Sequence, residues 1–80
     1  MTYQDAKDAA WEAFRRFDVA DHEWGKELVR VFGKQASDKR YQPVGHGKPG
    51  SALRALYVQR EQLRESWEAA REIERAARPK

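Results

Sequence analysis

Eighty residues with a net charge of +3 and no cysteine are enough for one small domain, and they exclude disulfides, thiolate metal sites and cysteine nucleophiles. No apolar run approaches the about 20 residues that a membrane helix needs, and the charged opening sequence is unlike a signal peptide. We therefore expect a single cytoplasmic domain, residues 1–80, without a membrane partner.

The charge is unevenly distributed along the chain. Residues 1–25 carry three basic and six acidic side chains, residues 26–60 carry eight basic and two acidic ones, and residues 61–80 carry five of each. A basic middle segment favours an acidic partner, or it complements the acidic N-terminal segment within the fold. The sequence leaves both interpretations open.

Apolar residues at three- and four-residue spacing predict two helices in the first half of the chain. The first covers residues 3–17 and begins at Thr2, which forms a capping-box pattern with Asp5. Asp18 to Asp21 is interpreted as a short break, because either aspartate can cap a following helix. The second helix, over residues 21–36, is amphipathic.

A loop over residues 37–50 is predicted by two prolines and three glycines. The third helix is predicted over residues 51–77 with Ser51 as its cap. The resulting fold class is all-α: a three-helix bundle with a long Gly/Pro-containing basic loop before an extended third helix. Leu56, Leu63 and the alanines that follow at the same spacing form a heptad-like seam, which makes self-association through the third helix one expectation.

Residues suited to catalysis or metal binding are few. His22-Glu23 lacks the second histidine of a zinc-protease motif, and His46 has no nucleophile or metal-ligand spacing around it. Residues 45–50, GHGKPG, match a dinucleotide pattern, but no strand precedes them, and Pro49 occupies the Ser or Thr position of a Walker loop. We expect a glycine-rich turn here, and a non-enzymatic protein with no catalytic residue, cofactor or metal.

Nucleic-acid binding is the alternative function that the sequence offers. Lysine and arginine neutralise phosphates, and an exposed tyrosine can stack on an unpaired base. The nucleic-acid-binding candidates are Lys34, Lys39, Arg40, Tyr41, Lys48 and Arg54. The spacing from Phe14 to Leu28 also resembles a helix-turn-helix unit, but Asp21 and Glu23 would repel phosphates, so an ordinary helical hairpin is favoured.

Docking of a protein partner is the function that the sequence favours, in the manner of a small adaptor or inhibitor. Trp11 lies about 100° from its helix's apolar stripe, and it is either exposed or covered by the third helix. Exposed tryptophan and arginine are typical of interaction hot spots. The partner-binding candidates are Trp11, Arg15, Lys39, Arg40, Tyr41, His46 and Lys48. This hypothesis requires the basic loop to remain unpaired within the monomer.

Overall fold

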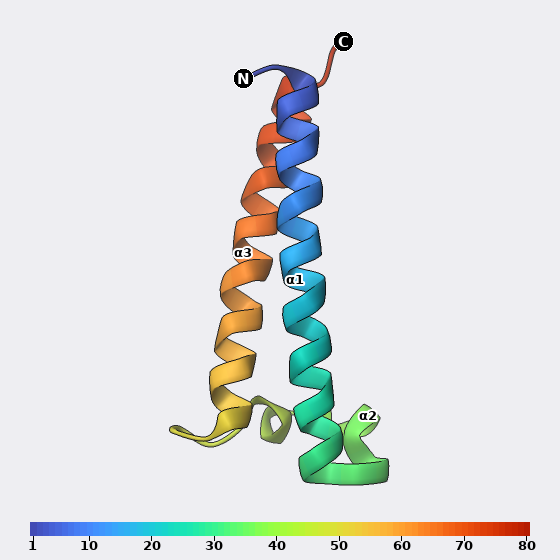
Figure 1. Cartoon of the computed structure of the whole chain (residues 1–80), viewed down its shortest axis with the longest axis vertical. Helices are drawn as coiled ribbons and strands as arrows, with labels where there is room; N and C mark the ends of the chain where they lie inside the picture. Colours follow the sequence, from blue (N-terminus) through green and yellow to red (C-terminus); the bar gives the residue numbers. More distant parts are fainter.

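Two long antiparallel helices and the segment that connects them make up the computed structural model, which describes all 80 residues and measures 47 × 23 × 17 Å (Figure 1). Helix α1 covers Tyr3–Phe32 and helix α3 covers Ala52–Ala77. The connecting segment contains a 3₁₀ turn at Gly33–Gln35, the single-turn helix α2 at Ala36–Lys39 and a second 3₁₀ turn at Pro43–His46. The all-helical prediction is confirmed.

The predicted three-helix bundle is wrong, because the helices expected at residues 3–17 and 21–36 are one continuous helix. The supposed break, Asp18 to Asp21, contains neither glycine nor proline, so nothing in it terminates a helix. The apolar stripe also keeps its phase across it, with Ala20 and Trp24 both buried. Neither aspartate acts as a cap, and the charge of Asp21 is instead neutralised by two arginines.

The two predicted helix starts that carry a side-chain cap are confirmed. Thr2 Oγ1 accepts a hydrogen bond from the Asp5 backbone N–H at 3.1 Å, and the Ser51 hydroxyl oxygen accepts one from the Arg54 backbone N–H at 3.1 Å. Helix α3 nevertheless does not extend beyond its neighbour, because α1 is the longer helix and both chain termini lie at one end of the hairpin (Figure 1).

Side-chain size changes along the hairpin. Ala6 and Ala10 are buried near the termini, where the two ribbons run closest together in Figure 1. Toward the connecting segment the helices separate, and the wider space is filled by a core cluster with Phe32, Leu56 and Tyr57 against it. The buried members of this cluster are Trp24, Leu28, Ala36 and Leu53. Larger side chains therefore set the greater separation at this end.

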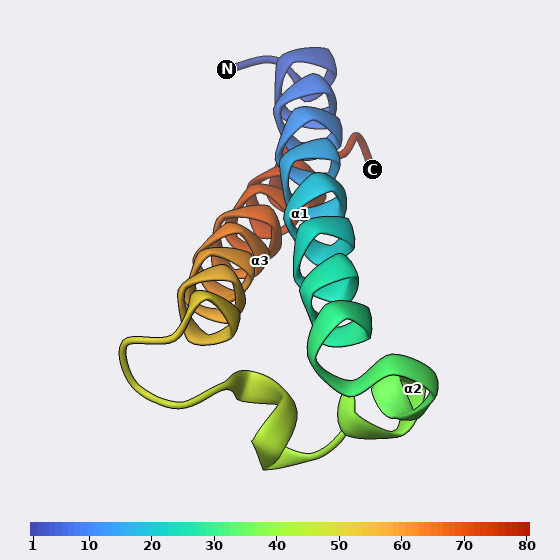
Figure 2. The ribbon, with the colours of Figure 1, turned by 60° about the horizontal axis from the view of Figure 1, so that its bottom comes forward.

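The connecting segment folds against the core instead of forming the predicted irregular loop. Trp24 Nε1–H donates a hydrogen bond to the Gly45 carbonyl oxygen at 3.0 Å, and the His46 ring stacks on Tyr57 with centroids 4.0 Å apart. Figure 2 shows this segment leaving α1, passing through α2 and crossing to the start of α3. It therefore closes one end of the hairpin.

Asp21 joins three parts of the chain. Its carboxylate accepts hydrogen bonds from Arg40 of the connecting segment and from Arg60 Nε of α3, the latter at 2.7 Å. The three side chains are only 21%, 28% and 19% exposed, respectively. Burial raises the pKa of Asp21, but the hydrogen bonds and positive charges of the two arginines outweigh it, so the pKa lies below its ordinary value.

Replacing Asp21 by asparagine should lower the free energy of unfolding by about 2 kcal/mol, because it leaves two poorly solvated guanidinium groups without a carboxylate. Since the folded-state pKa lies below the unfolded value, the stabilisation is complete above about pH 4 and is lost as the pH falls through the folded-state pKa. Urea unfolding of wild type and Asp21→Asn should therefore differ at neutral pH and converge in acid.

The matched control for this experiment is Asp18→Asn, which removes an exposed carboxylate from the same helix. Its effect should stay within about 0.5 kcal/mol. An equal effect of the two substitutions would contradict the role assigned to Asp21.

Two glycine substitutions should have opposite effects on stability. A Cβ atom at Gly45 would lie 2.1 Å from the Lys39 carbonyl oxygen, so Gly45→Ala should cost about 2 kcal/mol by displacing the connecting segment. At Gly25, inside the continuous helix, the nearest atom would be 3.6 Å away, and Gly25→Ala should stabilise by about 0.5–1 kcal/mol. Urea unfolding midpoints measure both. A destabilising Gly25→Ala would contradict a helix that runs through residue 25.

Candidate functional site

The predicted partner-binding residues do not form one surface. Trp11 and Arg15 lie in the half of α1 that is near the termini, whereas the other five belong to the connecting segment at the opposite end. From Trp11 to Phe32 the helix rises by about 31 Å at 1.5 Å per residue. A single partner contact that uses both groups would have to span most of the molecule.

The basic loop is partly used by the fold itself, which corrects the expectation of a free cationic projection. Arg40 pairs with Asp21 and lies over the Trp24 ring, 4.8 Å from its centroid, and His46 is packed on Tyr57. Of the remaining cations, Lys34, Lys39, Lys48 and Arg54 have no carboxylate within ion-pair distance. Tyr41 is 85% exposed.

Trp11 is exposed, so the alternative in which another helix covers it is wrong. Its side chain remains 63% accessible, although its ring stacks on Phe14 with centroids 5.8 Å apart. Phe14 in turn packs against Trp67 of α3 at 5.0 Å, and Trp67 stacks on Phe17 at 5.4 Å. With only two long helices, α3 covers the apolar stripe of α1 and leaves its flank open.

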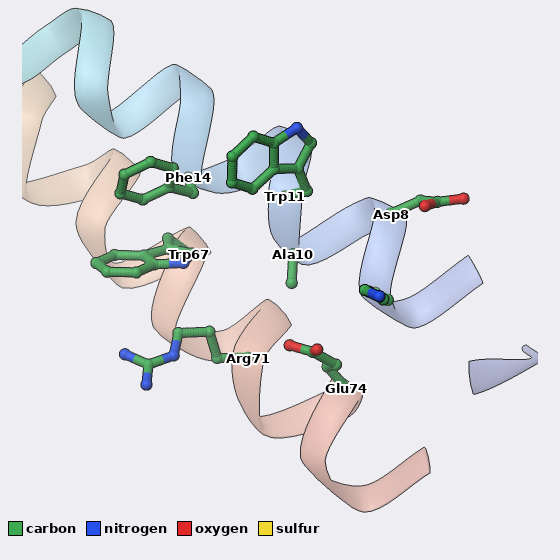
Figure 3. A pocket seen from close by; sticks show the side chains of 8 residues that line it. Asp8, Ala10, Trp11, Phe14, Trp67, Arg71 and Glu74 are labelled. Atoms are coloured by element: carbon green, nitrogen blue, oxygen red, sulfur yellow. The ribbon is translucent and has the colours of Figure 1, made fainter. Parts of the chain in front are cut away.

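An open groove of about 510 Å³ lies between the two helices at this point (Figure 3). Ala10 has only a methyl side chain, which leaves space for the groove, and Trp11 and Phe14 of the same helix lie beside Ala10. Across from them, Trp67 comes from α3, and the Arg71 guanidinium lies 5.1 Å from its ring centroid. The full lining is Lys7, Asp8, Ala10, Trp11, Phe14, Trp67, Arg71 and Glu74.

The groove has an apolar centre and a charged edge. Two cations, Lys7 and Arg71, and two carboxylates, Asp8 and Glu74, are all within its lining. The edge therefore carries no net charge but offers both signs. Arg15 lies outside this groove and is close to Glu12, with 3.9 Å between Nη1 and Oε2.

Sequence reasoning missed most of this groove. Trp67, Lys7 and Arg71 are not among the predicted binding residues, although all three line the groove. The periodicity of apolar residues predicts which face of each helix packs against a neighbour. It does not predict how many helices cover that face. The available signal was the presence of three tryptophans in 80 residues, of which only Trp24 is buried in the structure.

Three further findings concern metal binding, membrane spanning and similarity to known proteins. No three histidine, cysteine, aspartate or glutamate side chains gather closely enough to hold a metal ion. Neither long helix contains an apolar stretch of the length needed to cross a bilayer. Comparison with protein-family models, curated proteins and solved structures finds no match for this chain.

Acrylamide quenching of tryptophan fluorescence in dilute solution should show one accessible ring. Trp11→Phe should remove most of the readily quenched emission, because Trp11 is the most exposed indole. Trp24→Phe, the control, removes a buried ring and should leave that emission in place. If Trp11→Phe leaves the accessible fraction unchanged, the groove is covered in the monomer.

Proposed function

We propose that this chain is a non-enzymatic interaction protein, of adaptor or inhibitor type, that docks a protein partner in the groove around Trp11. The observation that carries the proposal is a 63% exposed tryptophan on the flank of an aromatic cluster, with Arg71 across the groove. Tryptophan, tyrosine and arginine dominate binding hot spots, because they combine large apolar area with directed polar groups.

The composition of the groove fits a protein partner better than a phosphate-bearing one. Apolar side chains at the centre and charged groups at the edge are the usual anatomy of a protein interface. Equal numbers of cations and carboxylates on that edge give phosphates no net attraction. A groove between two helices also suits an amphipathic helix, whose apolar anchors recur every three or four residues.

A second candidate function, nucleic-acid binding, is favoured by the opposite end of the hairpin. Tyr41 is exposed there for stacking, and four cations are not used in ion pairs: Lys34, Lys39, Lys48 and Arg54. Four phosphate contacts give modest affinity, and Arg40 is no longer among the available groups. The two functions therefore depend on residues at different ends and can be separated by substitution.

Partner capture from the native host, repeated after nuclease treatment, tests the proposed function. The immobilised baits are wild type, Trp11→Ala and Tyr41→Ala, which each remove one exposed aromatic ring from opposite ends of the hairpin. A specific protein should remain bound to wild type and Tyr41→Ala after nuclease. Trp11→Ala should lose it, with affinity reduced by about 30-fold or more.

A different pattern would contradict groove docking. Captured material would then be lost after nuclease treatment and with the Tyr41→Ala and Lys39→Ala baits, but not with Trp11→Ala. That result would assign the binding function to the basic end of the hairpin. Binding to a mixed oligonucleotide should then weaken with salt by about 0.9 log-log units per phosphate contact.

A further inference from the structure

The hairpin exposes more surface than a compact protein of its size. Its accessible surface is 5892 Å², whereas a monomer of 9.3 kDa is expected to expose about 5,000 Å², which leaves an excess of about 900 Å². Its radius of gyration is 15.5 Å, against about 12 Å for a compact chain of this length. A standard protein interface buries about 800 Å² on each partner, so the excess is close to one such interface.

The half of the hairpin near the chain termini has no further segment packed on its two helices. At the other end, the connecting segment packs on the helices through Trp24 and Tyr57. No comparable segment covers the half that contains Trp11, Phe14 and Trp67 (Figure 1). The aromatic side chains of this half therefore contact one neighbouring helix and solvent.

We propose that a second copy of this chain occupies the groove, so that the two copies pair through the halves of α1 and α3 that are near the termini and form a four-helix assembly there. This inference rests on the proposed function, because it names the partner of the same groove. A two-fold interface brings one surface against itself, so the surface must be self-complementary.

The groove meets this requirement in charge as well as in area. Lys7 and Arg71 of one copy can face Asp8 and Glu74 of the other, because the edge holds two groups of each sign. Trp11 supplies exposed apolar area to both copies at once. In a symmetric pair, the charged groups at the edge of one groove are therefore neutralised by the same groups of the other copy. An unrelated partner would need its own complementary charges at these positions.

Charge at the other end of the hairpin determines the direction of pairing. Lys34, Lys39 and Lys48 are not used in ion pairs, so two connecting segments side by side would repel one another. A two-fold axis perpendicular to the helices, near Trp11, places these basic ends at opposite ends of the assembly. The two copies are therefore antiparallel.

Sedimentation equilibrium from micromolar to millimolar concentration tests the pairing. Wild type and Tyr41→Ala should show a monomer–dimer equilibrium, and Trp11→Ala should raise the dissociation constant by about 30-fold or more. Alanine has the highest helix propensity, so Trp11→Ala should retain its helical circular dichroism, which excludes unfolding as the cause. A wild type that stays monomeric at millimolar concentration overturns the proposal.

The direction of pairing is measured with one spin label per chain. Lys34→Cys introduces a unique thiol, since the sequence has no cysteine. Antiparallel pairing places the two labels about 65 Å apart, because α1 rises by about 31 Å from Trp11, near the axis, to Phe32, and Lys34 follows just beyond its end. Parallel pairing would place them within about 30 Å, since packed helices lie 8–10 Å apart, and that distance would overturn the proposed arrangement.

These outcomes separate the partner from the function. A monomeric chain that still captures a different protein in a Trp11-dependent way overturns self-pairing and supports groove docking. If Trp11→Ala changes neither sedimentation nor capture, both are overturned.

Discussion

Each of two antiparallel helices can cover only one stripe of the other, and this geometric constraint determines what the molecule leaves exposed. Helix α1 runs without interruption from Tyr3 to Phe32, so the chain has two long helices and not three. No third long helix is present to cover the flank that carries Trp11. In its absence, the connecting segment is the only other cover, and it reaches only the end where Trp24 and Leu28 are buried.

The closed end of the hairpin is held by polar as well as apolar contacts. Asp21 is where the acidic N-terminal part of the chain neutralises the basic middle part, through Arg40 and Arg60. The same two guanidinium groups lie about 5 Å from the Trp24 ring. One end of the hairpin is thus a small, well-connected core, whereas the other is a pair of helices with an aromatic surface.

Local features of the fold could be predicted from the sequence, and long-range ones could not. Thr2 and Ser51 cap their helices as expected, because capping depends on residues within one turn. Asp18 and Asp21 were misinterpreted as caps, since an aspartate has the same local signature whether it ends a helix or binds a distant arginine. One of the arginines that bind Asp21, Arg60, is 39 residues away, so this interaction has no local signal in the sequence.

The sequence likewise indicated only the local features of the candidate site, because the others depend on long-range packing. The displacement of Trp11 from the apolar stripe was visible in the sequence, but its exposure depends on how many helices pack around it. Phe14 and Trp67 follow a core pattern and become part of the groove only because the hairpin has a single layer. Arg40 fits a binding site in the sequence, whereas in the structure it stabilises the fold.

The connecting segment closes one half of the hairpin, whereas the groove around Trp11 in the other half is open. Hydrogen exchange, measured residue by residue, tests this directly. In dilute solution, amides around Trp24 and Leu28 should exchange most slowly, and those between Ala6 and Phe17 much faster, with slowing as the groove becomes occupied. Equal protection of both halves in dilute solution would contradict an open groove around Trp11.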